Sequence, residues 1–213
     1  MVHVLIATRN AGKLREIRQL ATGTPLVCHG LNEFSDLPQV EESGATFAEN
    51  ARLKALEYAR AAGLCTLADD SGLEVDALGG EPGLHSARYA GSPHDDAANN
   101  RKLVQALAGV PAERRTARFR CAMALVRDGQ VVLESEGAVE GTIIDEPRGT
   151  NGFGFDPHFL IPHLGRTMAE LPAGQKNALS HRGQALRSML AQIEGLFQSL
   201  GEWGSRGSFP GIG

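Results

Sequence analysis

The chain has few aromatic residues, few cysteines and no long apolar run. Aromatic side chains make up 5% of its 213 residues, and no apolar stretch approaches the ~20 residues that a membrane-spanning helix needs. No secretory signal precedes the first apolar run. Cys28, Cys65 and Cys121 are isolated, so we expect reduced core residues rather than disulfides. These absences predict a soluble, cytoplasmic protein.

A run of basic residues is also lacking. The formal net charge is −4, so the chain does not have the positive surface by which proteins bind duplex nucleic acid. We therefore expect neither a nucleic-acid partner nor a membrane partner. The composition is that of an ordinary globular protein, with 42% hydrophobic and 22% charged residues. A chain of this length can bury a core large enough for a compact enzyme.

Apolar periodicity predicts an α/β fold in which strands and helices alternate. Thr46 and Glu49 have the spacing of a helix capping box, and Asp128-Gly129 is a strong signal for a β-hairpin turn. The hairpin makes the predicted sheet at least partly antiparallel. The predicted elements are strands over 2–7 and 65–68, a hairpin of 117–127 with 131–137, and helices after Lys13, after Thr46, over 95–108 and from Ala178.

Residues 67–72 are the most informative stretch, because an apolar run ends there in Asp69, Asp70, Ser71 and Gly72. A buried strand that carries carboxylates at its carboxyl end is typical of a metal or catalytic site. Neighbouring strand residues point to opposite faces, so we do not expect Asp69 and Asp70 to contact one ligand. The alternative is a strand that runs into an ordinary Asp-Ser-Gly turn.

Residues 8–13 form a short polar loop between a predicted strand and a predicted helix. Helix N-terminal N–H groups, the Thr8 and Asn10 side chains and the charge of Lys13 suit a phosphate group. The spacing is not that of a Walker A loop. A plain turn with a solvated lysine is the alternative interpretation.

Glu42 lies in a second polar loop and is, with Asp70, our candidate pair for Mg²⁺. Two carboxylates suffice when phosphate oxygens and water complete the coordination. A solvated acidic loop would explain Glu42 equally well. Lys54, one helical turn beyond Asn50, is either a surface cation or a phosphate ligand.

Residues 151–157 combine glycines, two aromatic rings and one carboxylate. A nucleotide base needs a stacking face and hydrogen bonds to its edge, which Phe153 or Phe155 and Asp156 could supply. The alternative is a bulge whose rings pack in the core. The cluster Lys176, Ser180, His181 and Arg182 indicates either a phosphate or base contact or a capped helix start with solvated cations.

The order and spacing of these segments closely resemble the inosine triphosphate pyrophosphatase family, whose members are also called dITP/XTP pyrophosphatases. The resemblance covers about residues 2–195. Its motifs are T-x-N-x-x-K at 8–13, E-S-G-x-T-F-x-E-N-A-x-x-K-A at 42–55, A-D-D-S-G-L at 68–73, P-G-x-x-S-A-R-Y at 82–89, G-F-G-F-D-P at 152–157 and K-x-x-x-S-H-R-G at 176–183.

The resemblance implies an elongated mixed sheet with flanking helices, two lobes and a central nucleotide cleft, in one domain over residues 1–200. A loose glycine-rich tail would follow at 201–213. It also implies a homodimer and Mg²⁺-dependent hydrolysis of ITP, dITP or XTP to the nucleoside monophosphate and pyrophosphate. Such a reaction keeps deaminated purines out of DNA and RNA.

Residue roles follow from the same resemblance. Glu42 and Asp70 would bind the metal, and Asp70 and Lys54 would be catalytic, with Asp70 as the proton acceptor for a water that attacks the α-phosphorus. His181 or Arg182 would donate to the 6-oxo group of the base. The implied substrate-binding residues are Thr8, Arg9, Asn10, Ala11, Gly12, Lys13, Ser71, Phe153, Gly154, Phe155, Asp156, Lys176, His181 and Arg182.

Three other functions compete with this interpretation. A Maf-like pyrophosphatase would act on modified pyrimidine or 7-methylguanosine triphosphates, but the motifs at 153–156 and 180–183 argue against it. A regulatory nucleotide-binding module would not need Glu42, Asp70, Lys13 and Lys54 together. An interaction protein would have little use for so many glycine-rich polar loops.

Overall fold

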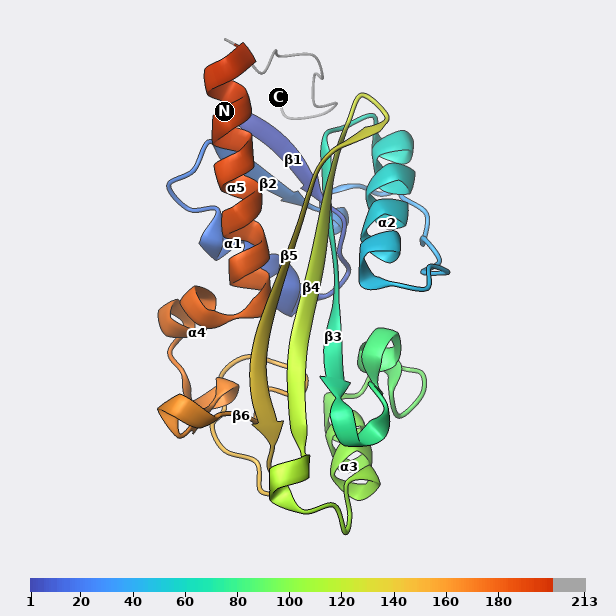
Figure 1. Ribbon diagram of the computed structural model, residues 1–213. Coiled ribbons are helices and arrows are strands. Elements are labelled where there is room, and N and C mark those ends of the chain that lie inside the picture. The colour runs from blue at the N-terminus through green and yellow to red at the C-terminus, as the bar shows by residue number, and fades with distance from the viewer. Residues whose placement is uncertain (201–213) are drawn as a thin grey trace. The chain divides into compact units, whose positions relative to one another are not determined.

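The computed structural model describes the backbone of residues 1–200 and side chains up to residue 195. The predicted tail over 201–213 lies outside this part. The helices and strands, shown in Figure 1, are β1 Val2–Ile6, α1 Ala11–Leu20, β2 Leu26–Gly30, α2 Phe47–Ala62, β3 Thr66–Val75, α3 Asp96–Ala106, β4 Thr116–Arg127, β5 Gln130–Ile143, β6 Phe159–Ile161, β7 Arg166–Thr167, α4 Ala173–Leu179 and α5 His181–Leu200.

The seven strands of the described residues belong to one mixed sheet, in the order β2-β1-β3-β4-β5-β6-β7. β1 pairs in parallel with both β2 and β3, whereas β6 pairs antiparallel with β5 and β7. The α/β class and the mixed sheet predicted from the sequence are therefore confirmed.

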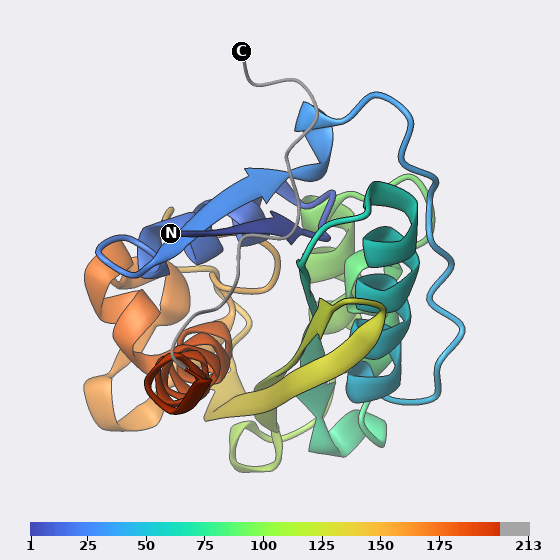
Figure 2. The ribbon, with the colours of Figure 1, turned by 90° about the horizontal axis from the view of Figure 1, so that it is seen from above.

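The chain forms two compact units, and β3, β4 and β5 contribute residues to both of them. Among the described residues, the first unit contains 1–70, 122–136 and 185–200, and the second contains 71–121 and 137–184. Within the first unit, α2 lies on one side of the strands and α1 and α5 lie on the other (Figures 1 and 2). Its core includes Leu5, Ile17, Leu67 and Met189, each at most 1% exposed.

The second unit has its own apolar core. The Phe119 and Phe159 rings lie 4.4 Å apart at its centre, and Leu73, Leu103 and Ile161 pack into the same cluster with no exposed surface. The burial of these side chains supplies most of the driving force for this unit, since apolar burial dominates folding.

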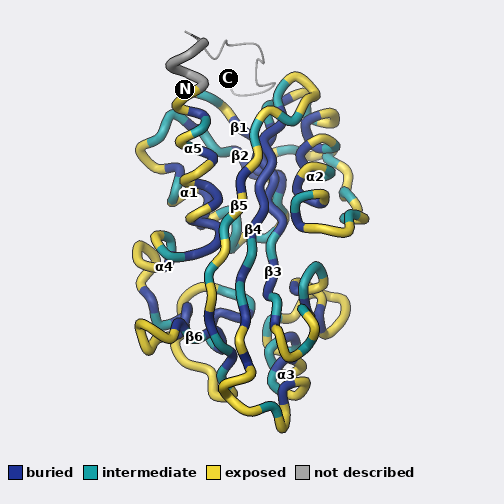
Figure 3. The backbone as a smooth tube through the Cα atoms, in the orientation of Figure 1, coloured by how far each residue is buried: buried dark blue, intermediate teal, exposed yellow. Residues whose placement is uncertain are grey.

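The β4–β5 hairpin turns at Asp128 and Gly129, as the sequence predicts. Both residues have positive φ, +52° and +75° respectively, which a tight two-residue turn between twisted strands requires. β4 is buried along most of its length, whereas β5 alternates between exposed and less exposed residues (Figure 3). One face of β5 is therefore in contact with solvent.

The helix starts follow their capping residues. The Asn10 side chain accepts a hydrogen bond from Lys13 N and begins α1, and the Thr46 side chain accepts one from Glu49 N and begins α2. An unpaired N–H at a helix start needs such an acceptor. Gly63 ends α2 in the left-handed conformation that favours glycine.

Three predicted boundaries are wrong. The strand predicted to end at Gly137 continues as β5 to Ile143, because its last residues pair with β6. The strand predicted to stop at Ala68 continues as β3 to Val75, because Leu73 and Val75 pack into the second core on alternate positions. The helix predicted from Ala178 is two helices, α4 and α5, which are separated by Ser180 in an extended conformation. The Ser180 hydroxyl accepts a hydrogen bond from Gly183 N, so it caps α5 and interrupts the helix.

Among the described residues, no helix is both long and apolar enough to cross a membrane.

The three cysteines are free thiols, of which Cys121 is buried and Cys28 and Cys65 are partly buried. Burial raises the pKa of the Cys28 and Cys65 thiols from 9.0 to about 11. Since the thiolate is the reactive form, each should be alkylated by iodoacetamide at pH 8 about 100-fold more slowly than an ordinary thiol. All three should react rapidly in denaturant, and rapid labelling of the native protein at either position would contradict the packing described.

Candidate functional site

The two aspartates of β3 bind different lysines. Asp69 Oδ2 lies 3.0 Å from Lys13 Nζ, and Asp70 Oδ1 lies 3.1 Å from Lys54 Nζ. The side chain of Asp69 has no exposed surface, and that of Asp70 is 10% exposed. The two adjacent side chains thus contact different lysines, and that they do not share one ligand stays a prediction.

Lys54 joins Asp70 to the loop that carries Glu42. Its ammonium group, on α2, donates to Glu42 Oε1 at 2.6 Å as well as to Asp70 Oδ1. Asn50, one turn earlier on α2, donates to Asp70 Oδ2 at 3.2 Å and accepts from Gly44 N at 2.7 Å. The loop, α2 and β3 are therefore tied together by buried polar side chains, and Lys54 is not a surface cation.

The charges of this cluster shift two pKa values. Burial alone would lower the pKa of Lys54, but the carboxylates of Asp70, Asp69 and Glu42 outweigh it and raise that pKa. Burial raises the pKa of Asp70, and the nearby lysine charges oppose that shift only in part. Three carboxylates share two ammonium groups, so these five side chains carry more negative than positive charge.

The loop over residues 8–13 joins this cluster through Lys13. Asn10 is a helix cap rather than part of a plain turn, and its N–H donates to Thr8 Oγ1 at 3.2 Å. The Arg9 guanidinium, predicted to contact substrate, donates to the Leu37 and Pro38 carbonyls at 3.2 and 3.3 Å. Ala11 and Gly12 form the first turn of α1, where backbone N–H groups favour an anion.

The donor set suits a divalent cation that is shared with a phosphate. Within the described residues, no group of three His, Cys, Asp or Glu side chains could hold a metal ion. Glu42 and Asp70 nevertheless bring oxygens to one point, since both contact the same Lys54 nitrogen. Mg²⁺ prefers oxygen ligands and usually keeps water or substrate oxygens in its remaining positions. The predicted pair fits the metal on these grounds.

In the second unit, the Asp156 carboxylate fixes the backbone of the aromatic segment, residues 151–157, by hydrogen bonds. Asp156 Oδ2 accepts from Phe153 N at 2.9 Å and from Lys176 Nζ at 2.5 Å. At Gly152, with φ +79°, a Cβ would lie 2.0 Å from Asp156 Oδ2, so only glycine fits there. Asp156 Oδ2 therefore binds groups of the protein, Phe153 N and Lys176 Nζ.

The Phe153 ring is flanked by two cations. Lys176 Nζ lies 4.9 Å and the Arg182 guanidinium 5.6 Å from the ring centroid, within the range of cation–π attraction. Arg182 also donates to Ser71 Oγ at 2.8 Å. Phe153 is only partly buried, so its ring is not simply a core residue, as the alternative interpretation required.

The remaining predicted residues occupy less exposed positions. Phe155 is 4% exposed and belongs to the core of the second unit, as the alternative interpretation predicted for the rings of this segment. The His181 ring stacks on Phe119 with centroids 4.9 Å apart. Lys176, His181 and Arg182 are each at most 6% exposed, so they are not solvated cations at a helix start.

Two residues of the cluster are not among those predicted from the sequence. Asp69 has no assigned role in the predicted site, yet it is the partner of Lys13. Asn50 is a motif position without a predicted role, yet it is 2% exposed and binds both Asp70 and Gly44. Asn50 is a polar residue on the otherwise apolar, buried side of α2, one turn before Lys54. That position could have indicated its role from the sequence, because a buried polar side chain needs a partner.

The fold and this cluster define an α/β protein in which lysines of two helices pair with buried carboxylates in the middle of a central strand. The particular family follows from comparison with known sequences. A model of the Ham1 family matches residues 4–192. The chain belongs to the Ham1 family.

Known relatives match over nearly their whole length. A dITP/XTP pyrophosphatase of Geobacter sulfurreducens is 53% identical over 186 residues, which cover 87% of this chain and 94% of that protein. A HAM1 protein from Coxiella burnetii has a similar solved structure, with a TM-score of 0.82, 42% identity and coverage of 92% and 100%. For a nucleoside-triphosphatase / dITP/XTP pyrophosphatase of Mycobacterium abscessus, the TM-score is 0.70, with 41% identity and coverage of 90% and 99%.

The Asp156–Lys176 pair should be important for stability. Both side chains are at most 6% exposed, and removal of one partner from a buried pair leaves an uncompensated charge. Lys176→Met should lower the free energy of unfolding by about 3–5 kcal/mol, measured by urea denaturation.

Arg52→Met is the matched control, because it removes a cation from the exposed Arg52–Glu134 pair and should cost far less. If the two variants cost the same, the buried pair does not have the proposed importance.

Proposed function

We propose that the protein hydrolyses deaminated purine nucleoside triphosphates, ITP, dITP and XTP, to the nucleoside monophosphate and pyrophosphate. The observation that carries the proposal is 53% identity, over nearly the whole chain, to a dITP/XTP pyrophosphatase. This reaction removes deaminated purines before they enter DNA or RNA. A cytoplasmic location and a homodimer, both expected from the sequence, belong to the same proposal.

Residues of the first unit bind the phosphates. Lys13 and Lys54 offset the negative charge that gathers on the leaving pyrophosphate, which is the main requirement in phosphoryl transfer. Thr8, Asn10 and the first turn of α1 supply hydrogen bonds to phosphate oxygens, and Arg9 holds the loop that leads to Glu42.

Glu42 and Asp70 would hold Mg²⁺, which would supply further positive charge at the phosphate oxygens. Asp70 accepts the proton of the attacking water. Lys54 keeps the Glu42 and Asp70 carboxylates together before substrate arrives, because its ammonium group donates to both. Preorganised charge of this kind costs no rearrangement during the reaction.

Residues of the second unit bind the base. The Phe153 ring offers a stacking face, and Lys176, His181 and Arg182 offer hydrogen-bond donors. A 6-oxo purine accepts from such donors, whereas the 6-amino group of adenine leaves them unpaired at a cost of roughly 1–3 kcal/mol each. Ser71 and Asp156 position Arg182 and Lys176, respectively.

The direct test is pyrophosphate release from ITP, dITP, XTP, ATP and GTP, with Mg²⁺ and with EDTA. We expect rapid release from the three deaminated purines and none in EDTA. Release from ATP should be about 10–100-fold slower for each donor that adenine leaves unpaired. Equal release from ATP would favour a different pyrophosphatase, and binding without release from any nucleotide would favour a regulatory module.

Asp70→Asn tests the proton acceptor. The amide cannot take a proton from water, so kcat should fall by about 10²–10⁴. Asp76→Asn is the control, since Asp76 is an exposed carboxylate that pairs with Arg118 and should not affect turnover. Wild-type turnover in Asp70→Asn, with normal Mg²⁺ binding by calorimetry, would remove Asp70 from this role.

A further inference from the structure

We propose that Asp96 and Asn100 of α3 are positioning residues that set the base specificity of this enzyme through the backbone of Gly154. The inference rests on the proposed function, because it concerns how the base-binding segment is held. Neither residue belongs to any of the six sequence motifs.

Both polar groups of Gly154 are bound by one face of α3. Gly154 N donates to Asp96 Oδ2 at 2.8 Å, and Asn100 Nδ2 donates to Gly154 O at 2.9 Å. Asp96 and Asn100 are four residues apart and therefore lie on the same side of the helix. Gly154 has φ +63°, so its backbone is in a conformation that other residues rarely adopt.

The two hydrogen bonds that Asp96 and Asn100 make with Gly154 restrict the backbone of its neighbour Phe153. Phe153 N donates to Asp156, and the next N–H along the chain, that of Gly154, donates to Asp96. With both N–H groups fixed, the backbone dihedrals of Phe153 have little freedom. The direction of the Phe153 Cα–Cβ bond is then fixed, and from it the ring reaches Lys176 and Arg182, which lie 4.9 and 5.6 Å from its centroid.

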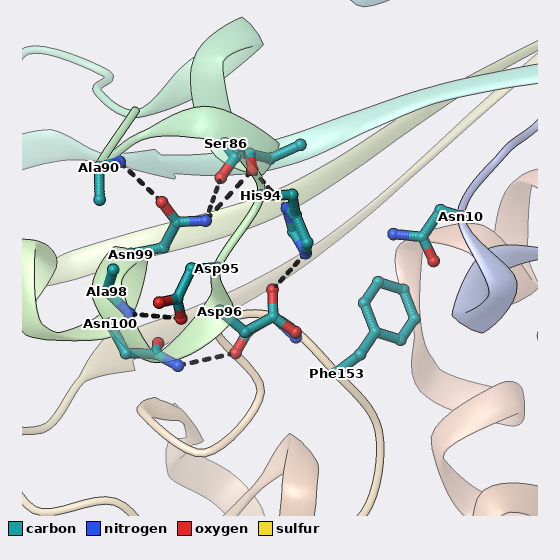
Figure 4. Close-up of polar contacts among 12 residues, drawn as sticks. Asn10, Ser86, Ala90, His94, Asp95, Asp96, Ala98, Asn99, Asn100 and Phe153 are labelled. Atoms are coloured by element: carbon teal, nitrogen blue, oxygen red, sulfur yellow. Dashed lines mark hydrogen bonds and ion pairs between the residues drawn. The ribbon is translucent and has the colours of Figure 1, made fainter. Parts of the chain in front are cut away.

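The start of α3 is itself held by its neighbours. Asp95 caps the helix by accepting from Ala98 N, and His94 Nε2 lies 2.8 Å from Asp96 Oδ1, on the oxygen that does not bind Gly154 (Figure 4). Asn99 bonds a different segment, accepting from Ala90 N at 2.7 Å and donating to Ala87 O at 3.2 Å. His94 therefore lies beside Asp96 Oδ1, although within the described residues that oxygen accepts no hydrogen bond.

The test separates the base end of the ligand from the phosphate end. Inosine monophosphate probes the base contacts, and inorganic pyrophosphate probes the phosphate contacts, both by calorimetry on the full chain. Asp96→Ala should weaken inosine monophosphate binding about tenfold, because the variant removes a hydrogen bond to a charged acceptor. Asn100→Ala should weaken it about threefold, and pyrophosphate affinity should not change in either variant.

Kinetics give the second readout. Asp96→Ala should raise KM for ITP and lower the ratio of kcat/KM between ITP and ATP by about tenfold, with a smaller effect on kcat. Asp96→Asn keeps an acceptor for Gly154 N and should restore most of the preference. Gln105→Ala, an exposed polar position of the same helix, is the matched control and should behave as wild type.

Two results would overturn the inference alone. In the first, Asn100→Ala and Asp96→Ala both bind inosine monophosphate as tightly as the unmutated protein, and the unmutated protein hydrolyses ITP. The other is equal weakening of inosine monophosphate and pyrophosphate, which would indicate a general structural role. If Asp96→Ala does not fold, Asn100→Ala and Asp96→Asn decide by the same criteria. A wild-type protein that releases no pyrophosphate from ITP would overturn the proposed function and this inference together.

Discussion

The position of the Glu42 loop relative to β3 depends on the contacts of the Lys54 ammonium group. It lies between Glu42 of a loop and Asp70 of β3, with a side chain that is only 10% exposed. A buried charge is tolerated only when it is paired and hydrogen-bonded. Most of the loop over residues 32–46 is exposed or only partly buried, so this ion pair and the Asn50–Gly44 hydrogen bond fix where its carboxylate lies.

The second unit also contains a buried lysine–aspartate pair that positions a neighbouring segment. Asp156 and Lys176 are buried together, and the carboxylate also holds the backbone of Phe153. In each unit a lysine from a helix binds an aspartate from a strand or turn, and the pair places a neighbouring group, Glu42 in one and Phe153 in the other. Low local dielectric strengthens both pairs and makes an unpaired partner costly. In both units the buried charges therefore position a neighbouring group.

Local signals in the sequence predicted much of this structure. Thr46 begins a helix because its short polar side chain satisfies a free N–H group, and Asp128-Gly129 turns the hairpin because both residues adopt positive φ. The predictions that fail are those in which distant packing overrides local preference. β3 passes through two aspartates because Leu73 and Val75 enter a core, and Ser180 breaks a helix by capping the next one.

The sequence by itself determined the α/β class, the Thr46 helix cap, the hairpin and the candidate site residues, because all of these depend on neighbours within a few positions. Only the tertiary structure decided the partners: Lys13 with Asp69, Lys54 with Glu42 and Asp70, and Gly154 with Asp96 and Asn100. Gly154 and Asp96 are 58 residues apart in the chain. Such pairings arise when the folded backbone brings buried polar groups within reach of each other, since each must find a partner away from water.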